Sequence, residues 1–139
     1  MPQRWLFKTE PETYSYDQLE ADKKCVWDGV SNNQALKNLR TVRLGDEVLI
    51  YHTGNEKAIV GLAEAITEAY PDPNAPNAED EHLVVINLKP KRRIKTPVTL
   101  ADIKANEAFS EFDLVRLPRL SVMPISKEYW ALLQDLLKL

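Results

Sequence analysis

AIVGLAEAI at residues 58–66 and HLVVINL at residues 82–88 are two apolar runs that contain several β-branched residues. Such runs, when polar turn residues bound them, are typical of buried strands. The segment between them is rich in Pro, Asn and acidic residues, which predicts a surface loop over residues 70–81. We therefore expect the two runs to be antiparallel neighbours in one sheet.

Shorter segments on either side extend this sheet and place helices around it. Further strands are predicted at residues 4–8, 47–52 and 119–123. Helix starts are predicted at Ser15, which forms a capping box with Gln18, at Asn32, at Thr99 and at Ser126, the last before an amphipathic helix over residues 127–139. The fold class is therefore α+β, with a curled sheet or partial barrel of five strands, short peripheral helices and a C-terminal helix.

The composition limits what this domain can bind. The 139 residues fit one domain over residues 1–139, and 18 Lys and Arg against 21 Asp and Glu give a net charge of −3. This charge balance excludes a protein that binds strongly and nonspecifically along the backbone of a polyanion. One cysteine and two histidines cannot make a usual four-ligand zinc site, and no cofactor is expected. Without an apolar run of signal-peptide or membrane-spanning length, we expect a cytoplasmic protein, nuclear in a eukaryote, with no membrane partner.

Motifs for catalysis are absent from the sequence. The four glycines form neither a dinucleotide fingerprint nor a phosphate-binding loop, and no nucleophile elbow surrounds Ser121 or Cys25. One enzymatic alternative remains, a small nucleotide-processing enzyme in which His52 is the general base and Glu10 or Asp28 orients it. Another alternative is a protein-interaction module that uses the C-terminal helix.

Two segments combine polar and aromatic groups in a way that fits a binding site. Lys8-Thr9-Glu10-Pro11 places an ammonium, a hydroxyl and a carboxylate at the mouth of the first strand, although Thr9 and Glu10 could instead only stabilise the turn. In the segment 25–32, Trp27 precedes an Asp-Gly turn, so its ring is either a core residue or a stacking wall for a planar base.

Two segments carry clustered cations. Residues 116–124 hold Arg116 and Arg119, which could bind phosphates or form surface salt bridges. The run 89–95 holds five cations within seven residues, which fits contact with a nucleic-acid backbone, a nuclear localisation signal or an exposed, solvated hairpin end. Because the whole chain is acidic, any backbone contact would be local.

The order of these motifs resembles that of the EVE domain, a member of the PUA-like superfamily. The resemblance spans residues 5–124 and is carried by the following segments: Trp5-Leu6-Phe7-Lys8-Thr9-Glu10-Pro11, Tyr16, Trp27-Asp28-Gly29-Val30 with Asn32 and Ala35, Gly45-Asp46, Tyr51-His52, Ile59-Val60-Gly61, Tyr70-Pro71-Asp72-Pro73, Thr99-Leu100 with Ile103-Lys104, and Arg119-Leu120-Ser121-Val122-Met123-Pro124. Each segment alone is weak, and the ordered series is specific. It implies a PUA-like pseudobarrel with a curled mixed sheet.

The resemblance also implies a function, which is non-catalytic binding of DNA or RNA that carries a modified base, or of a free modified nucleotide. A methylated or hydroxymethylated cytosine extruded from its stack would need an aromatic wall and a few polar groups at its edge. Trp27 is then expected to be the wall and Asn32 an edge reader. The remaining expected pocket residues are Lys8, Thr9, Glu10, Asp28, Gly29, Val30, Tyr51, His52 and Ser121, with Arg119 and Lys37 for backbone phosphates.

The chain departs from the family pattern beside this expected pocket. Where the family usually has Arg, Asn and Tyr, this sequence has Ser31, Asn32 and Asn33. A cation and an aromatic ring are therefore replaced by small polar side chains. After Tyr51-His52 the family usually has Ser, and Thr53 keeps the hydroxyl and adds a methyl group.

Overall fold

The fold is a strongly curled mixed sheet with helices at its periphery. It is described by a computed structural model that covers residues 2–74 and 83–139. The strands are β1 (Arg4–Thr9), β2 (Cys25–Trp27), β3 (Glu47–His52), β4 (Ala58–Ala65), β5 (Tyr70–Pro71), β6 (Val84–Thr99) and β7 (Val122–Ile125). The helices are α1 (Tyr16–Asp22), α2 (Asn33–Thr41), α3 (Leu100–Lys104), α4 (Asp113–Arg116) and α5 (Lys127–Leu137), with a 3-10 turn at Glu107–Phe109.

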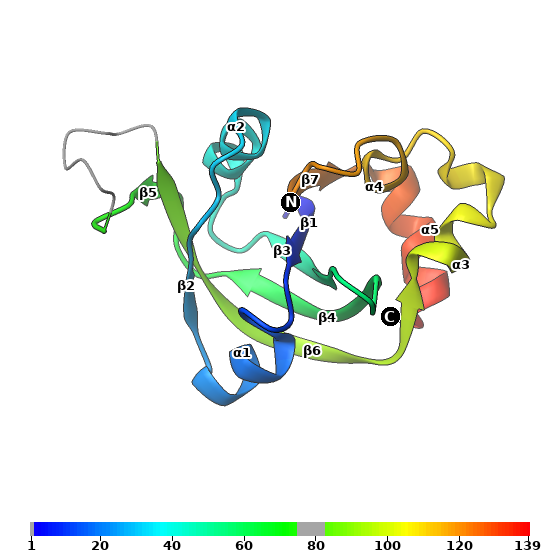
Figure 1. The fold of residues 1–139 in the computed structure, drawn as a ribbon, viewed down its shortest axis with the longest axis horizontal. Coiled ribbons are helices and arrows are strands. Elements are labelled where there is room, and N and C mark those ends of the chain that lie inside the picture. Colours follow the sequence, from blue (N-terminus) through cyan, green and yellow to red (C-terminus); the bar gives the residue numbers. More distant parts are fainter. Residues whose placement is uncertain (1, 75–82) are drawn as a thin grey trace.

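The strands follow the order β2-β6-β4-β3-β1-β7, and β5 pairs with β6 off this path. β1 runs parallel to β3, and every other pair among the described strands is antiparallel. Figure 1 shows α1 at one end of the curled sheet, with α3 and α5 grouped at the other. The predicted α+β class and curled mixed sheet are thus confirmed.

Every predicted strand is present, and the limits of two of them, β6 and β7, differ from the prediction by more than one residue. Residues 58–66 and 82–88 were predicted to pair, and β4 does pair with β6, but β6 continues far past Leu88 to Thr99. The last strand is β7, which starts at Val122 rather than at residue 119. In the predicted loop, Tyr70 and Pro71 form β5, whereas residues 75–82, which include His82, lie outside the described part of the chain.

The predicted caps Ser15, Thr99 and Ser126 are present, and Asn32, predicted as the first residue of its helix, is the N-cap of α2. The side chains of Ser15, Asn32, Thr99 and Ser126 each accept a hydrogen bond from a backbone N–H in the first turn of the helix that follows. Thr99 and Asp102 form a full capping box. The box predicted at Ser15 is incomplete, because the Gln18 amide donates instead to Asp22 one turn later.

The core fills the inside of the curl and continues beneath α5. The largest fully buried side chains are Tyr16, Phe7, Phe109, Phe112, Leu6, Leu19, Leu36, Leu39, Leu49, Ile50, Ile59 and Ile86. Beside this core, the buried carboxylate of Asp46 accepts hydrogen bonds from the Trp5 indole and from the backbone N–H groups of Gln3 and Arg43. A single carboxylate therefore ties the start of β1 to the turn that leads into β3.

Candidate nucleic-acid interface

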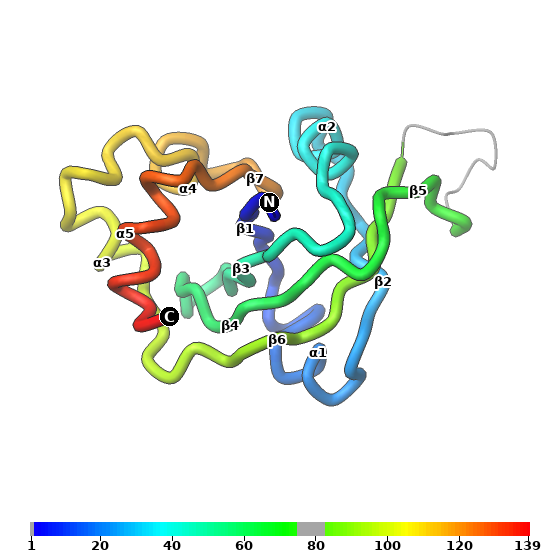
Figure 2. The backbone as a smooth tube through the Cα atoms, turned by 180° about the vertical axis from the view of Figure 1, so that it is seen from behind, coloured from blue at the N-terminus to red at the C-terminus, as the bar shows by residue number. Residues whose placement is uncertain are grey.

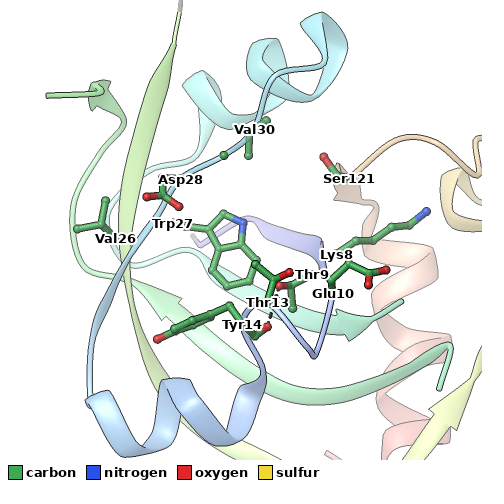
Figure 3. Close-up of a pocket in the computed structure, with 11 residues that line it drawn as sticks. Lys8, Thr9, Glu10, Thr13, Tyr14, Val26, Trp27, Asp28, Val30 and Ser121 are labelled. Atoms are coloured by element: carbon green, nitrogen blue, oxygen red, sulfur yellow. Dashed lines mark hydrogen bonds between the residues drawn. The ribbon is translucent and has the colours of Figure 1, made fainter. Parts of the chain in front are cut away.

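A cavity of about 420 Å³ opens where β1, β2 and the start of β7 come together. Its lining comes from four short segments, which supply Lys8, Thr9, Glu10, Thr13, Tyr14, Val26, Trp27, Asp28, Gly29, Val30 and Ser121. A backbone hydrogen bond from Lys8 N to Ser121 O, 2.9 Å long, holds the segment before β7 against β1. Residues more than a hundred positions apart therefore form one pocket (Figure 3).

Trp27 forms one wall of this cavity and also packs into the core. The sequence placed it in a turn, but it is the last residue of β2, opposite Ile86 of β6, and only 7% of it is exposed. Its ring lies 5.7 Å from that of Phe7 and meets Tyr14 edge-on at 6.2 Å and 87°. Trp27 is thus a core residue that also lines the cavity, and two other rings fix its orientation; its role as a stacking wall for a base stays a prediction.

The Trp27 indole N–H is available to a ligand. Within the described residues it has no hydrogen-bond acceptor, and Figure 3 shows it on the side of the ring that faces Val30. Gly29, with φ of +77°, turns the chain immediately after the wall, so that Val30 comes back over the cavity. The wall therefore offers an aromatic face and one donor.

The opposite side of the cavity is polar and internally bonded. The Lys8 ammonium donates to the Pro118 carbonyl at 2.8 Å and lies 5.8 Å from the centre of the Tyr51 ring. Burial lowers the pKa of Lys8 from its usual value. Since this ammonium is turned toward Pro118, the stem of Lys8 faces the cavity.

Thr9 and Glu10 do the turn-stabilising work that the sequence allowed, and they also line the cavity. The Thr9 hydroxyl donates to the Tyr14 carbonyl at 2.8 Å, and the backbone carbonyl of Glu10 accepts from Thr13 and Tyr14. The Thr53 hydroxyl donates to the Glu10 carboxylate at 2.6 Å. This bond explains why a hydroxyl at position 53 is useful to the site.

Asn32, Tyr51 and His52 were predicted to face the pocket, and the structure does not place them among its lining residues. Asn32 Oδ1 caps α2 by accepting from the Ala35 N–H at 3.0 Å. Tyr51 is buried in β3, beneath Lys8. Conversely, Thr13, Tyr14 and Val26 line the cavity and were not predicted.

His52 is held in the core between two partners. Its Nε2 accepts a hydrogen bond from the Tyr16 N–H at 3.0 Å, so the ring proton sits on Nδ1, which donates to Glu56 at 2.7 Å. The predicted orienting residue, Glu10 or Asp28, was wrong, since the carboxylate at His52 belongs to Glu56. The histidine holds the start of α1 to the end of β3, and the geometry does not present it as a general base.

The predicted phosphate contacts lie outside the cavity on exposed segments. Lys37 is on α2, and Arg119 follows Pro118 in the segment that leads to β7. Arg116 pairs with Asp113 at 3.4 Å, which bears out the salt-bridge interpretation for that residue. Within the described residues, Arg119 has no ion pair.

The basic run 89–95 is not a hairpin end. It forms the middle of β6, and three of its five cations are held by carboxylates of neighbouring elements. Lys89 pairs with Glu64 and Lys91 with Glu47, while Arg93 contacts Asp17 and Glu20 of α1 and lies over the Tyr16 ring. These three side chains therefore link β6 to β3, β4 and α1.

A model of the EVE domain matches residues 3–136 of this chain. The chain belongs to the EVE domain family. Thymocyte nuclear protein 1 of Rattus norvegicus is 31% identical to it over 89% of this chain and 69% of that protein. Within the described residues, this EVE domain has no helix long and apolar enough to cross a membrane.

Solved structures resemble this EVE domain along almost its whole length. A protein of Rhodopseudomonas palustris matches with a TM-score of 0.87 at 38% identity, covering 96% of this chain and 91% of that one. The human THYN1 protein, in complex with 5-methylcytosine containing DNA, matches with a TM-score of 0.89 at 27% identity, covering 99% of this chain and 98% of that one. The predicted curled mixed sheet with peripheral helices thus agrees with the folds of these solved proteins.

Proposed function

We propose that this EVE domain binds DNA that carries a modified cytosine and holds the extruded base against Trp27. The observation that carries the proposal is the cavity beside a tryptophan whose orientation is fixed by Phe7 and Tyr14. The structure of a relative of the same fold with 5-methylcytosine containing DNA supports the choice of ligand. The role is binding, and no reaction is assigned to the site.

The lining groups match what an extruded base needs. The Trp27 ring offers a stacking face, and Val30 offers apolar surface that suits a methyl group. The Trp27 N–H and the hydroxyl of Ser121 can bond to acceptors on the base edge, and the Asp28 carboxylate can accept from an exocyclic amine. Arg119 and Lys37, both exposed, are proposed to contact backbone phosphates.

The first experiment compares the affinities of wild type for one oligonucleotide with and without a single 5-methylcytosine. We expect Trp27→Ala to weaken binding of the methylated oligonucleotide by about 5- to 150-fold, which corresponds to the 1–3 kcal/mol of one stacking contact. Binding of the unmodified oligonucleotide should change little, because phosphate contacts dominate it.

Trp27 is also a core residue, so its loss destabilises the fold, and a matched control is needed. Trp130 of α5 is buried to a similar degree, 8% exposed against 7%, and it does not line the cavity. Trp130→Ala should therefore lower stability and leave the preference for the methylated oligonucleotide unchanged. Equal loss of preference in both variants, or none in Trp27→Ala, would contradict the proposal.

A further inference from the structure

The far end of β6 carries a small hollow that the base pocket does not use. It is lined by β6 residues 92–96 together with the C-terminal end of α5, and its volume is about 50 Å³. This volume is far smaller than the 420 Å³ of the cavity beside Trp27. Figures 1 and 2 both show this bend of β6 beside the C-terminal end of α5.

A bulge in β6 produces the hollow. Gly61 of β4 pairs with Arg93 and Ile59 pairs with Val98, so four β6 residues, 94–97, stand opposite Val60 alone. Bulges bend a strand and redirect its side chains, and they are common beside functional sites. Here Ile94 is buried while Lys95, Thr96 and Pro97 are exposed. The bulge therefore leaves Lys95 and the Thr96 hydroxyl at the hollow.

The cations at the hollow differ from the other cations of β6. Lys89, Lys91 and Arg93 are each held by carboxylates, as described above. Arg92 and Lys95 have no carboxylate within ion-pair distance in the part of the chain that the structure describes, and neither does Lys138, the C-cap of α5. These three cations, the hollow cations Arg92, Lys95 and Lys138, all line the same small space.

We propose that the hollow cations bind a phosphate group. Arg92 provides a planar fork that matches phosphate oxygens, and Lys95 and Lys138 add compact charges with the Thr96 hydroxyl beside them. The site goes beyond the proposed function, since it needs no modified base. The phosphate comes either from a nucleic-acid backbone or from free phosphate in solution.

The hollow is near enough to the pocket for a backbone phosphate of DNA bound at the pocket to reach it. Ile86 pairs with Trp27, and Arg92 lies six residues further along β6, no more than about 20 Å away at 3.3 Å per residue. Phosphates of one DNA strand are spaced by about 3.4 Å along the helix axis, so this span corresponds to roughly six of them.

The test compares Arg92→Gln/Lys95→Gln with the matched control Lys89→Gln/Lys91→Gln, which removes two paired cations of the same strand. Binding of an unmodified duplex is measured across salt concentrations. If the ligand is a backbone phosphate, the plot of log K against log salt should be less steep by about two in the first variant. The change in the control should be smaller. The preference of both variants for 5-methylcytosine should match that of wild type, which separates this proposal from that for Trp27.

Inorganic phosphate, titrated against the wild type and followed by the NMR signal of the Arg92 side chain, distinguishes the two sources. Saturable shifts in wild type that are absent from Lys95→Gln/Lys138→Gln, together with an unchanged salt slope in Arg92→Gln/Lys95→Gln, identify free phosphate as the ligand. If the hollow cations instead only stabilise the carbonyls at the end of α5, the variants should have a lower thermal midpoint. They should then show neither a change in the salt slope nor a loss of phosphate-induced shifts, because wild type shows no such shifts either. That result would overturn the proposal.

Discussion

The sequence predicted a residue of the cavity lining correctly where its neighbours or its motif indicated its position in the fold. Trp27 beside an Asp-Gly pair predicted a wall, and Ser121 was taken from the motif order; both line the cavity. Asn32 and His52 were expected in the pocket from the family resemblance, and the structure uses them to cap α2 and to hold α1. Amides and imidazoles serve both purposes, so residue type alone does not distinguish a ligand group from a structural one.

The close contact between Gly61 and Tyr16 leads to a prediction on stability. A Cβ at position 61 would lie 2.2 Å from the Tyr16 ring, which is fully buried and whose hydroxyl donates to the Leu62 carbonyl at 2.7 Å. We expect Gly61→Ala to lower the free energy of unfolding by about 3 kcal/mol, because neither the ring nor the strand can move freely. Urea unfolding followed by fluorescence measures it.

A double-mutant cycle provides the control. In a Tyr16→Ala background the ring is gone, so Gly61→Ala should cost much less than it does in wild type. If the cost is the same in both backgrounds, the clash with Tyr16 is not its cause.

At the scale of elements, the sequence predicted starts of helices better than the length of strands. Ser and Thr caps have a local chemical cause, and the predicted caps are present. β6 was expected to end near Leu88, because a run of cations is typical of an exposed segment. It continues because carboxylates of β3, β4 and α1 lie beside it, and these neighbours are distant in the sequence.

The cap of α2 tests whether Asn32 also reads the base. Asp caps helices as well as Asn does, whereas Ala does not. We expect Asn32→Asp to leave the free energy of unfolding close to that of wild type, and Asn32→Ala to lower it by about 1 kcal/mol. Chemical denaturation measures both values.

Binding of the two variants completes that test. Since the cavity lining does not include Asn32, Asn32→Asp should keep the preference for a 5-methylcytosine oligonucleotide. A loss of preference in Asn32→Asp, with stability retained, would restore the original assignment of Asn32 as an edge reader.

At the scale of the molecule, charge pairing makes stability depend on pH. Burial alone would raise the pKa of Glu47, but hydrogen bonds and charges from Lys91 and Arg4 outweigh it and hold that pKa below its usual value. A depressed carboxyl pKa stabilises the fold above the unfolded value, near 4.5, and this contribution is lost as pH falls through the folded value. We expect the free energy of unfolding to drop below about pH 4.5.

Glu47→Gln identifies the share of this drop that belongs to one carboxylate. The variant should be less stable than wild type at pH 7, and the difference should shrink toward pH 3, where wild-type Glu47 becomes protonated as well. Urea midpoints at several pH values measure this. A constant difference across that range would show that the ion pairs of Glu47 do not cause the pH dependence.

The net charge of −3 indicated at first that a polyanion was an unsuitable partner. In three dimensions the charges are not spread evenly, because carboxylates hold three of the five β6 cations and leave Arg92 and Lys95 exposed at the bend. Total charge is read from a sequence directly, whereas pairing depends on which strands become neighbours.

The position of β1 has a consequence for biosynthesis. This strand is made first, yet it lies between β3 and β7, and β7 ends at Ile125. On the ribosome, one edge of β1 has no partner until β7 has been synthesised, and an open strand edge of this kind favours pairing with other chains. The same segment brings Ser121 against Lys8, so a nascent chain completes the lining of its cavity only after the residues around Ser121 have emerged.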